Sequence, residues 1–180
     1  IGTAKRYIND IQNEVSNILD FFNDTKNASY EDSLSGIELL SNTGIMNLIK
    51  PFFRAWIDAA EGSSDEIDAL SVTFEEGDNF NFFNFFQTAL IYEYLGDLEK
   101  AEVFYARGLN EQGLLNLRAV EAYAKILKTN GKTYDAISLL EEYIDQAPAN
   151  EQLKATLNSV QNDESFPPFA SNLDEGFAEI

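Results

Sequence analysis

The groups in this 180-residue chain that could carry out acid–base chemistry are carboxylates, because the sequence has 31 Asp and Glu residues but no His and no Cys. It therefore lacks thiol nucleophiles, imidazole bases, disulfides and the common zinc ligands. A pair of facing carboxylates can hydrolyse a glycosidic bond. Acidic residues cluster at Asp65-Glu66-Ile67-Asp68, at Glu75-Glu76-Gly77-Asp78 and at Glu141-Glu142.

Nothing in the spacing of these clusters places two carboxylates face to face. Acidic residues in the first turn of a helix oppose the helix dipole favourably, so capping and solubility account for most of them. No stretch has the alternating Asp or Asn, central Gly and closing Glu of an EF-hand calcium loop. We therefore predict no catalytic residue, no metal and no cofactor, and keep a helical-toroid hydrolase with paired carboxylates as an alternative.

The charge balance narrows the class of partner. A formal net charge of −19, with only 12 Lys and Arg, argues against binding to nucleic acid phosphates or to an anionic membrane surface. No apolar run of about 18 residues is present, so we expect no membrane insertion by this stretch. The first residue is Ile1 and no signal-peptide pattern follows it, so we expect a piece of a longer protein.

Small, aromatic and glycine residues recur with the spacing of a helix-pair repeat. Each glycine falls between two amphipathic stretches, where it can close a helix in the left-handed conformation. In the clearest copy these positions are Ala89, Tyr92, Gly96, Ala101 and Tyr105. In a second copy, about 35 residues later, they are Ala124, Leu127, Gly131, Ala136 and Leu140.

Two degenerate copies precede these. Gly62 lies at the expected turn but Ile67 enlarges the crossing position, and Tyr30 marks an earlier turn. Pro51 lies within an apolar helical stretch, where it predicts a kink or a restart. The predicted domain covers residues 1–162. Its helix pairs span approximately 3–41, 44–76, 80–111 and 115–147, followed by a capping helix at 151–161.

Residues 163–180 are predicted to form a proline-containing tail or a linker to a following repeat. Within it, Phe166-Pro167-Pro168-Phe169 excludes helix and favours an extended backbone. Two interpretations remain open for this stretch. Its phenylalanines fold back on the repeat surface, or the stretch binds an SH3-like or WW-like partner.

With these residues the chain resembles tetratricopeptide-repeat (TPR) proteins of α-proteobacterial type, of which it would be an interior stretch. The likeness is clearest at Gly96-Asp97-Leu98-Glu99-Lys100-Ala101-Glu102 and at Leu117-Arg118-Ala119-Val120-Glu121-Ala122-Tyr123. It implies an all-α, right-handed superhelix of about four helix pairs, a concave groove for ligands, no catalytic residues and often a place in the cell envelope. Phe21 departs from the family pattern, because a small residue is expected there.

The resemblance also implies where a site would lie, since the first helix of each TPR pair lines the concave side. The third pair would expose an aromatic strip, and the fourth a stripe of cations. Glu93 falls on the same side. The aromatic strip and the cations together suit a peptide with apolar anchors and a carboxylate. The predicted groove residues are Phe83, Phe86, Leu90, Tyr94, Arg118, Glu121, Lys125 and Lys128.

The sequence therefore predicts a scaffold that binds a peptide or a neighbouring subunit. One alternative is that the aromatic residues are core and the lysines are a solvated helix face, which would make the chain a structural spacer in a longer superhelix. The paired-carboxylate hydrolase is the other alternative. The compartment, the oligomeric state and the identity of the partner are left open.

Overall fold

Every regular element in the described part of the chain is an α-helix, which confirms the predicted all-α class. The structure, a computed structural model, describes residues 16, 20, 21, 29–40, 44, 46–74, 80–110 and 117–180. No helix within these ranges is long and apolar enough to cross a bilayer. The described residues form two compact units, one comprising residues up to Asp68 with residues 172–180, and one comprising residues 69–171.

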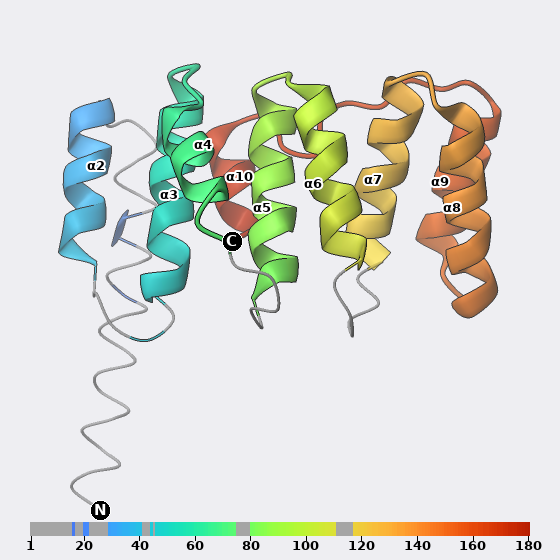
Figure 1. The fold of residues 1–180 in the computed structure, drawn as a ribbon, viewed down its shortest axis with the longest axis horizontal. Helices are drawn as coiled ribbons and strands as arrows, with labels where there is room; N and C mark the ends of the chain where they lie inside the picture. Colours follow the sequence, from blue (N-terminus) through green and yellow to red (C-terminus); the bar gives the residue numbers. More distant parts are fainter. Residues whose placement is uncertain are drawn as a thin grey trace, which may run out of the picture. The chain divides into compact units, whose positions relative to one another are not determined.

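The larger unit is a row of helices that pack in sequence order. Each helix contacts the next one along the chain, and the last also contacts the third. Figure 1 shows the first four side by side, with alternating directions. The helices are α5 (Asn81–Tyr94), α6 (Leu98–Asn110), α7 (Leu117–Thr129), α8 (Thr133–Gln146) and α9 (Glu151–Gln161).

One backbone motif ends α5, α7 and α9. At the end of α5 the N–H of Gly96 donates to the carbonyl of Glu93 at 3.0 Å, and the following N–H reaches one residue further back. This motif needs a residue in the left-handed region, and Gly96 and Gly131 supply it with φ of 79° and 78°. Asp163 takes the same place after α9 with φ of 62°, where a side chain adds steric cost.

The core of the larger unit lies where small residues let the helices approach. Ala89, Ala101, Ala124 and Ala136, the small positions of the two clear repeats, are all fully buried. Around Ala124 and Ala136, the helices α7, α8 and α9 share an apolar cluster, to which the capping helix α9 contributes two residues. The fully or nearly fully buried members of this cluster are Val120, Ala124, Leu127, Ala136, Leu140, Leu153 and Val160.

The smaller unit packs α2 (Tyr30–Leu39) and α10 (Leu173–Ala178) against α3 (Met46–Ala60). In its core the Phe53 ring lies 5.4 Å from the Phe21 ring and 5.2 Å from the Phe177 ring. The bulky Phe21 is accommodated because its neighbour is Gly36, where an added Cβ would come within 3.1 Å of the ring. A small residue on the opposite side therefore compensates for the departure from the repeat pattern.

The structure answers two expectations about helix boundaries. The α3 helix continues through Pro51, so the chain does not restart there. Most residues before Tyr30 in the predicted helix pair at 3–41 lie outside the described part. The segment that was expected as a tail contains α10, whose residues belong to the smaller unit.

Gly176 is the point at which α10 meets Trp56. A Cβ added to Gly176 would lie 2.5 Å from the indole ring, which is fully buried. We expect Gly176→Ala to lower the free energy of unfolding by about 1–3 kcal/mol, since overpacking forces the ring or the helix to move. Trp56 is the only tryptophan, so its fluorescence reports the unfolding directly. The exposed neighbour Asp174→Ala serves as the control, and equal unfolding midpoints for both variants would contradict the predicted clash.

Candidate functional site

Residues 162–171, which we call the return segment, run back from the end of α9 across α7 to α5 (Figure 1). The left-handed conformation of Asp163 turns the chain at this point. The Asp163 carboxylate forms an ion pair with Lys128 of α7, which lowers the pKa of Asp163. The segment therefore has one fixed contact at its start and reaches α5 at its other end.

The contact with α5 is a hydrogen bond to a buried carboxylate. The main-chain N–H of Phe169 donates to Oε1 of Glu93 at 2.8 Å. The other oxygen, Oε2, accepts the hydroxyl of Tyr105, a fully buried residue of α6, at 2.6 Å. Glu93 is 6% exposed, so both of its oxygens exchange water for protein donors.

Burial governs the protonation of Glu93. Loss of hydration raises the pKa of its carboxyl group above the ordinary value, against the lowering effects of the Tyr105 and Phe169 hydrogen bonds and of the Lys125 charge. A buried carboxylate that retains its charge depends on its donors. The return segment supplies one of them, so the segment and the ionised state of Glu93 support each other.

Two aromatic rings of the return segment lie beside cations of α7. The Phe169 ring is 4.9 Å from the Arg118 guanidinium and 5.4 Å from Nζ of Lys125. Phe166 packs against the apolar cluster of α7, α8 and α9, with Lys125 Nζ 5.6 Å from its ring. These are cation–π contacts, each contributing about 0.5–1 kcal/mol at exposed sites.

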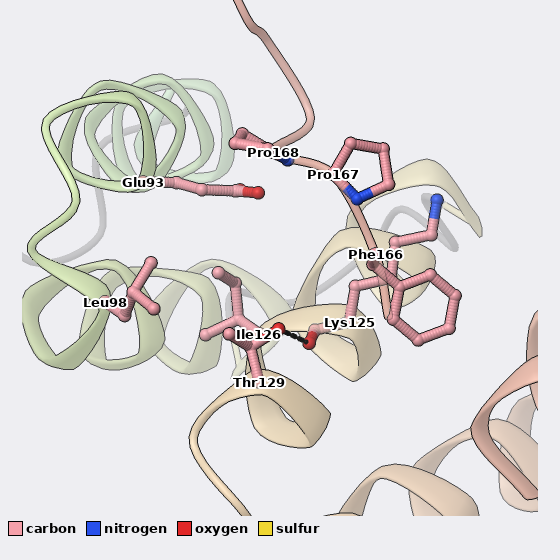
Figure 2. Close-up of a pocket in the computed structure, with 8 residues that line it drawn as sticks. All are labelled: Glu93, Leu98, Lys125, Ile126, Thr129, Phe166, Pro167 and Pro168. Atoms are coloured by element: carbon pink, nitrogen blue, oxygen red, sulfur yellow. Dashed lines mark hydrogen bonds between the residues drawn. The ribbon is translucent and has the colours of Figure 1, made fainter. Parts of the chain in front are cut away.

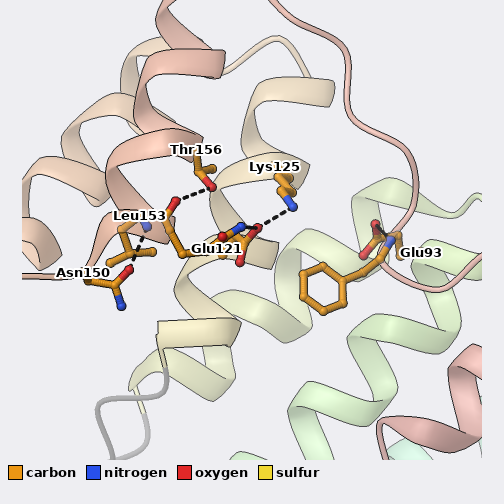
Figure 3. A network of polar contacts seen from close by, with 8 residues as sticks. Glu93, Glu121, Lys125, Asn150, Leu153 and Thr156 are labelled. Carbon is orange, nitrogen blue, oxygen red and sulfur yellow. Dashed lines mark hydrogen bonds and ion pairs between the residues drawn. The ribbon is translucent and has the colours of Figure 1, made fainter.

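Lys125 is held in place by a partner on its own helix, which in turn bonds to α9. Its Nζ donates to Oε1 of Glu121 at 2.6 Å, and the same oxygen accepts Nε2 of Gln152 from α9 at 3.0 Å. Figure 3 shows Lys125 between Glu121 on one side and Glu93 on the other. The cation that faces the two rings is therefore fixed by a bridge between α7 and α9.

A small pocket remains beneath the return segment. It encloses roughly 110 Å³ and lies between α5, α6, α7 and the segment itself. Figure 2 shows the Glu93 side chain extending toward the segment at the pocket, with Phe166 and the two prolines on the opposite side. Its lining residues are Glu93, Leu98, Lys125, Ile126, Thr129, Phe166, Pro167 and Pro168.

The predicted groove residues fall into two groups. Arg118, Lys125 and Lys128 lie together along α7, and each contacts the return segment. Glu121 lies among them but is buried as the partner of Lys125. These contacts also show that the phenylalanines of the tail fold back on the helices, the first of the two interpretations of that stretch.

The prediction that the groove residues of α5 are exposed was wrong for two of them. Phe86 and Leu90 are 6% and 1% exposed, and the Phe86 ring lies 6.0 Å from Tyr105 of α6. The reason is that α5 is packed on nearly every side, so that polar residues of the helix are buried along with the apolar ones. Phe83 and Tyr94 are half-buried.

Sequence reasoning left Glu93 out of the predicted groove set, although its helical position placed it on the correct side. The missing signal was its partner, because the N–H that it accepts lies 76 residues away in the sequence. Asp163 was overlooked because it occupies a place that glycine holds after α5 and α7.

Two of the three acidic clusters lie on described helices. Asp65, Glu66 and Asp68 lie in the first turn of α4 (Asp65–Ser71), as expected for capping. Asp58 of α3 accepts the N–H of Glu66 at 3.1 Å and so caps the start of this helix. Glu141 and Glu142 are exposed on α8, and the cluster at residues 75–78 lies outside the described ranges.

Comparison with known proteins gives no match to a protein-family model, to a curated protein or to a solved structure.

The raised pKa of Glu93 predicts a pH dependence of stability. The folded state binds the Glu93 proton more tightly than the unfolded state does, so protonation of Glu93 stabilises the fold. This contribution to the free energy of unfolding is complete below the ordinary pKa of 4.5 and is lost as pH rises through the raised pKa. Glu93→Gln keeps an acceptor for the Phe169 N–H but cannot titrate. We expect the unfolding free energy of the wild type to fall more steeply between pH 4.5 and pH 7 than that of this variant.

Denaturant unfolding at a series of pH values measures the difference. The exposed Glu141→Gln on α8 is the matched control, because it removes the same charge, and its profile should follow the wild type. Parallel profiles for the wild type and Glu93→Gln would contradict the buried-carboxylate account.

Proposed function

We propose that this chain is an interaction scaffold of the TPR kind, and that it holds an extended peptide on the surface formed by α5 and α7. We call this surface the α5–α7 face. It consists of Glu93, Arg118, Lys125 and Lys128 with the apolar surface between them. The observation that supports this proposal is that the return segment, a stretch of the same chain, already lies on the α5–α7 face. It makes a main-chain hydrogen bond, two ring contacts and an ion pair with this face.

The helix arrangement supports the repeat part of this proposal. The left-handed residues Gly62, Gly96, Gly131 and Asp163 follow α3, α5, α7 and α9 at intervals of about 32 to 35 residues, close to the TPR period. The same pair of backbone hydrogen bonds closes all four helices. On this reading α9 is the first helix of a further pair, and the return segment follows where a second helix would stand.

The contacts support the peptide-binding part. Extended peptides are commonly held by main-chain hydrogen bonds for affinity and by side-chain pockets for specificity. The α5–α7 face provides both to residues 163–169, although these residues make no regular secondary structure of their own. A surface that binds one such stretch in the same chain can bind a similar stretch from another protein.

The spacer hypothesis is the competing function, and the same segment favours it in one respect. If residues 163–170 are a permanent part of the fold, the α5–α7 face is covered and has no external ligand. The two functions differ in whether the face binds a free peptide once its own segment has been weakened.

In the full chain, the substitutions Phe166→Ala and Phe169→Ala together remove both aromatic anchors of the return segment. A synthetic peptide of residues 162–171 is then added. We expect saturable changes in the NMR amide signals of α5 and α7, with a dissociation constant of about millimolar or tighter, the range of effective concentrations of short tethers. Titration to several millimolar covers this range. Signals of α5 and α7 that do not change in a folded protein would support the spacer function and overturn this proposal.

A pair of charge reversals locates the binding surface. Arg118→Glu, added to the double variant, should weaken peptide binding because it removes the cation beside Phe169. Lys154→Glu on α9 makes the same change of charge at an exposed lysine whose ion-pair partner is Glu151 of its own helix, and should leave binding unchanged. Equal effects of the two substitutions would show a general charge effect instead of a defined site.

A further inference from the structure

We infer that the partner is an extended peptide with two aromatic residues three positions apart. An acidic residue lies three positions before the first aromatic residue, and at least one proline lies between the two. The second aromatic residue has a free main-chain N–H. We further infer that Glu93 selects for this N–H. The inference rests on the proposed peptide-binding function and states which peptides the α5–α7 face accepts.

The selection by Glu93 follows from the proline pair. Pro167 and Pro168 carry no N–H, so Phe169 offers the only main-chain donor in those three residues, and this donor bonds to Oε1 of Glu93. Prolines also restrict the backbone before binding, which reduces the entropy lost on ordering. A peptide with proline in place of Phe169 would leave the buried carboxylate without one of its two donors.

The spacing of the aromatic anchors follows from the positions of the cations. Phe166 and Phe169 both lie within 6 Å of Lys125, and Arg118 lies on Phe169. One cation therefore serves two rings that are three residues apart. A peptide with a different spacing could place only one ring beside Lys125.

The acidic position follows from Asp163. Its left-handed backbone is the conformation that glycine supplies after α5 and α7, yet here the residue is an aspartate that pairs with Lys128. The ion pair gives a reason for the side chain at that position. It also gives a local attraction for an acidic peptide on a chain whose net charge of −19 would otherwise repel it.

Because the return segment already bears this pattern, it competes with any external partner. A tether of this kind acts as an effective ligand concentration of about millimolar. A partner therefore displaces the segment only when the ratio of its concentration to its dissociation constant exceeds the same ratio for the tethered segment. The return segment thereby sets a threshold for occupancy of the face.

The test uses the full chain with Phe166→Ala and Phe169→Ala, and three peptides of residues 162–171. One has the natural sequence, one carries N-methylphenylalanine at position 169, and one has Asn in place of Asp163. N-methylation removes the donor and keeps the ring. We expect it to weaken binding about tenfold, because a buried acceptor that loses its donor keeps its full desolvation cost.

Lys128→Ala in the same protein separates the contribution of the acidic residue. It should weaken binding of the natural peptide but not of the Asn peptide, because the ion pair is already absent from the latter.

Where the double alanine variant does not fold, the single variant Phe169→Ala takes its place. The outcomes separate the two proposals. If no peptide binds, peptide binding itself fails. If the natural and N-methyl peptides bind equally, only the selection by Glu93 fails.

Discussion

The arrangement of the larger unit depends on the two hydrogen bonds that the Glu93 carboxylate accepts. One of its oxygens accepts the Tyr105 hydroxyl from α6 and the other accepts the Phe169 N–H from the return segment. A buried charge is tolerated only when its hydrogen bonds are made, so removing either donor is costly. The single carboxylate therefore ties α5 to its own helix pair and to a stretch of chain that begins beyond α9.

Around this group the structure distributes two kinds of contact. Helix-to-helix packing is apolar and close, as at the buried alanines of the two clear repeats. The return segment combines apolar packing of Phe166 with one main-chain hydrogen bond, rings beside cations and one ion pair at an exposed aspartate. Of these contacts, the ion pair at the exposed aspartate contributes little and weakens in salt. A segment held in this way can be exchanged at lower cost than a helix of the array.

The helices were predictable because they depend on local pattern. Glycine positions and apolar periodicity located the helix ends around Gly96 and Gly131, and the cations of α7 were correctly grouped because residues three and four apart share a helix face. The burial of Phe86 and Leu90 was not predictable from a repeat pattern, since it reflects packing on nearly every side of this particular helix. The bond between Glu93 and Phe169 joins residues far apart in sequence, and no local rule indicates such a pairing.

Amide hydrogen exchange at Phe169 tests the central claim most directly. Its N–H follows two prolines in a segment without regular secondary structure, so it has no helical partner that could protect it. If the return segment occupies the α5–α7 face, this amide exchanges far more slowly than the amide of Ser165, and the protection is lost in Phe166→Ala. Exchange of the Phe169 amide at the rate of an unstructured peptide would contradict the account.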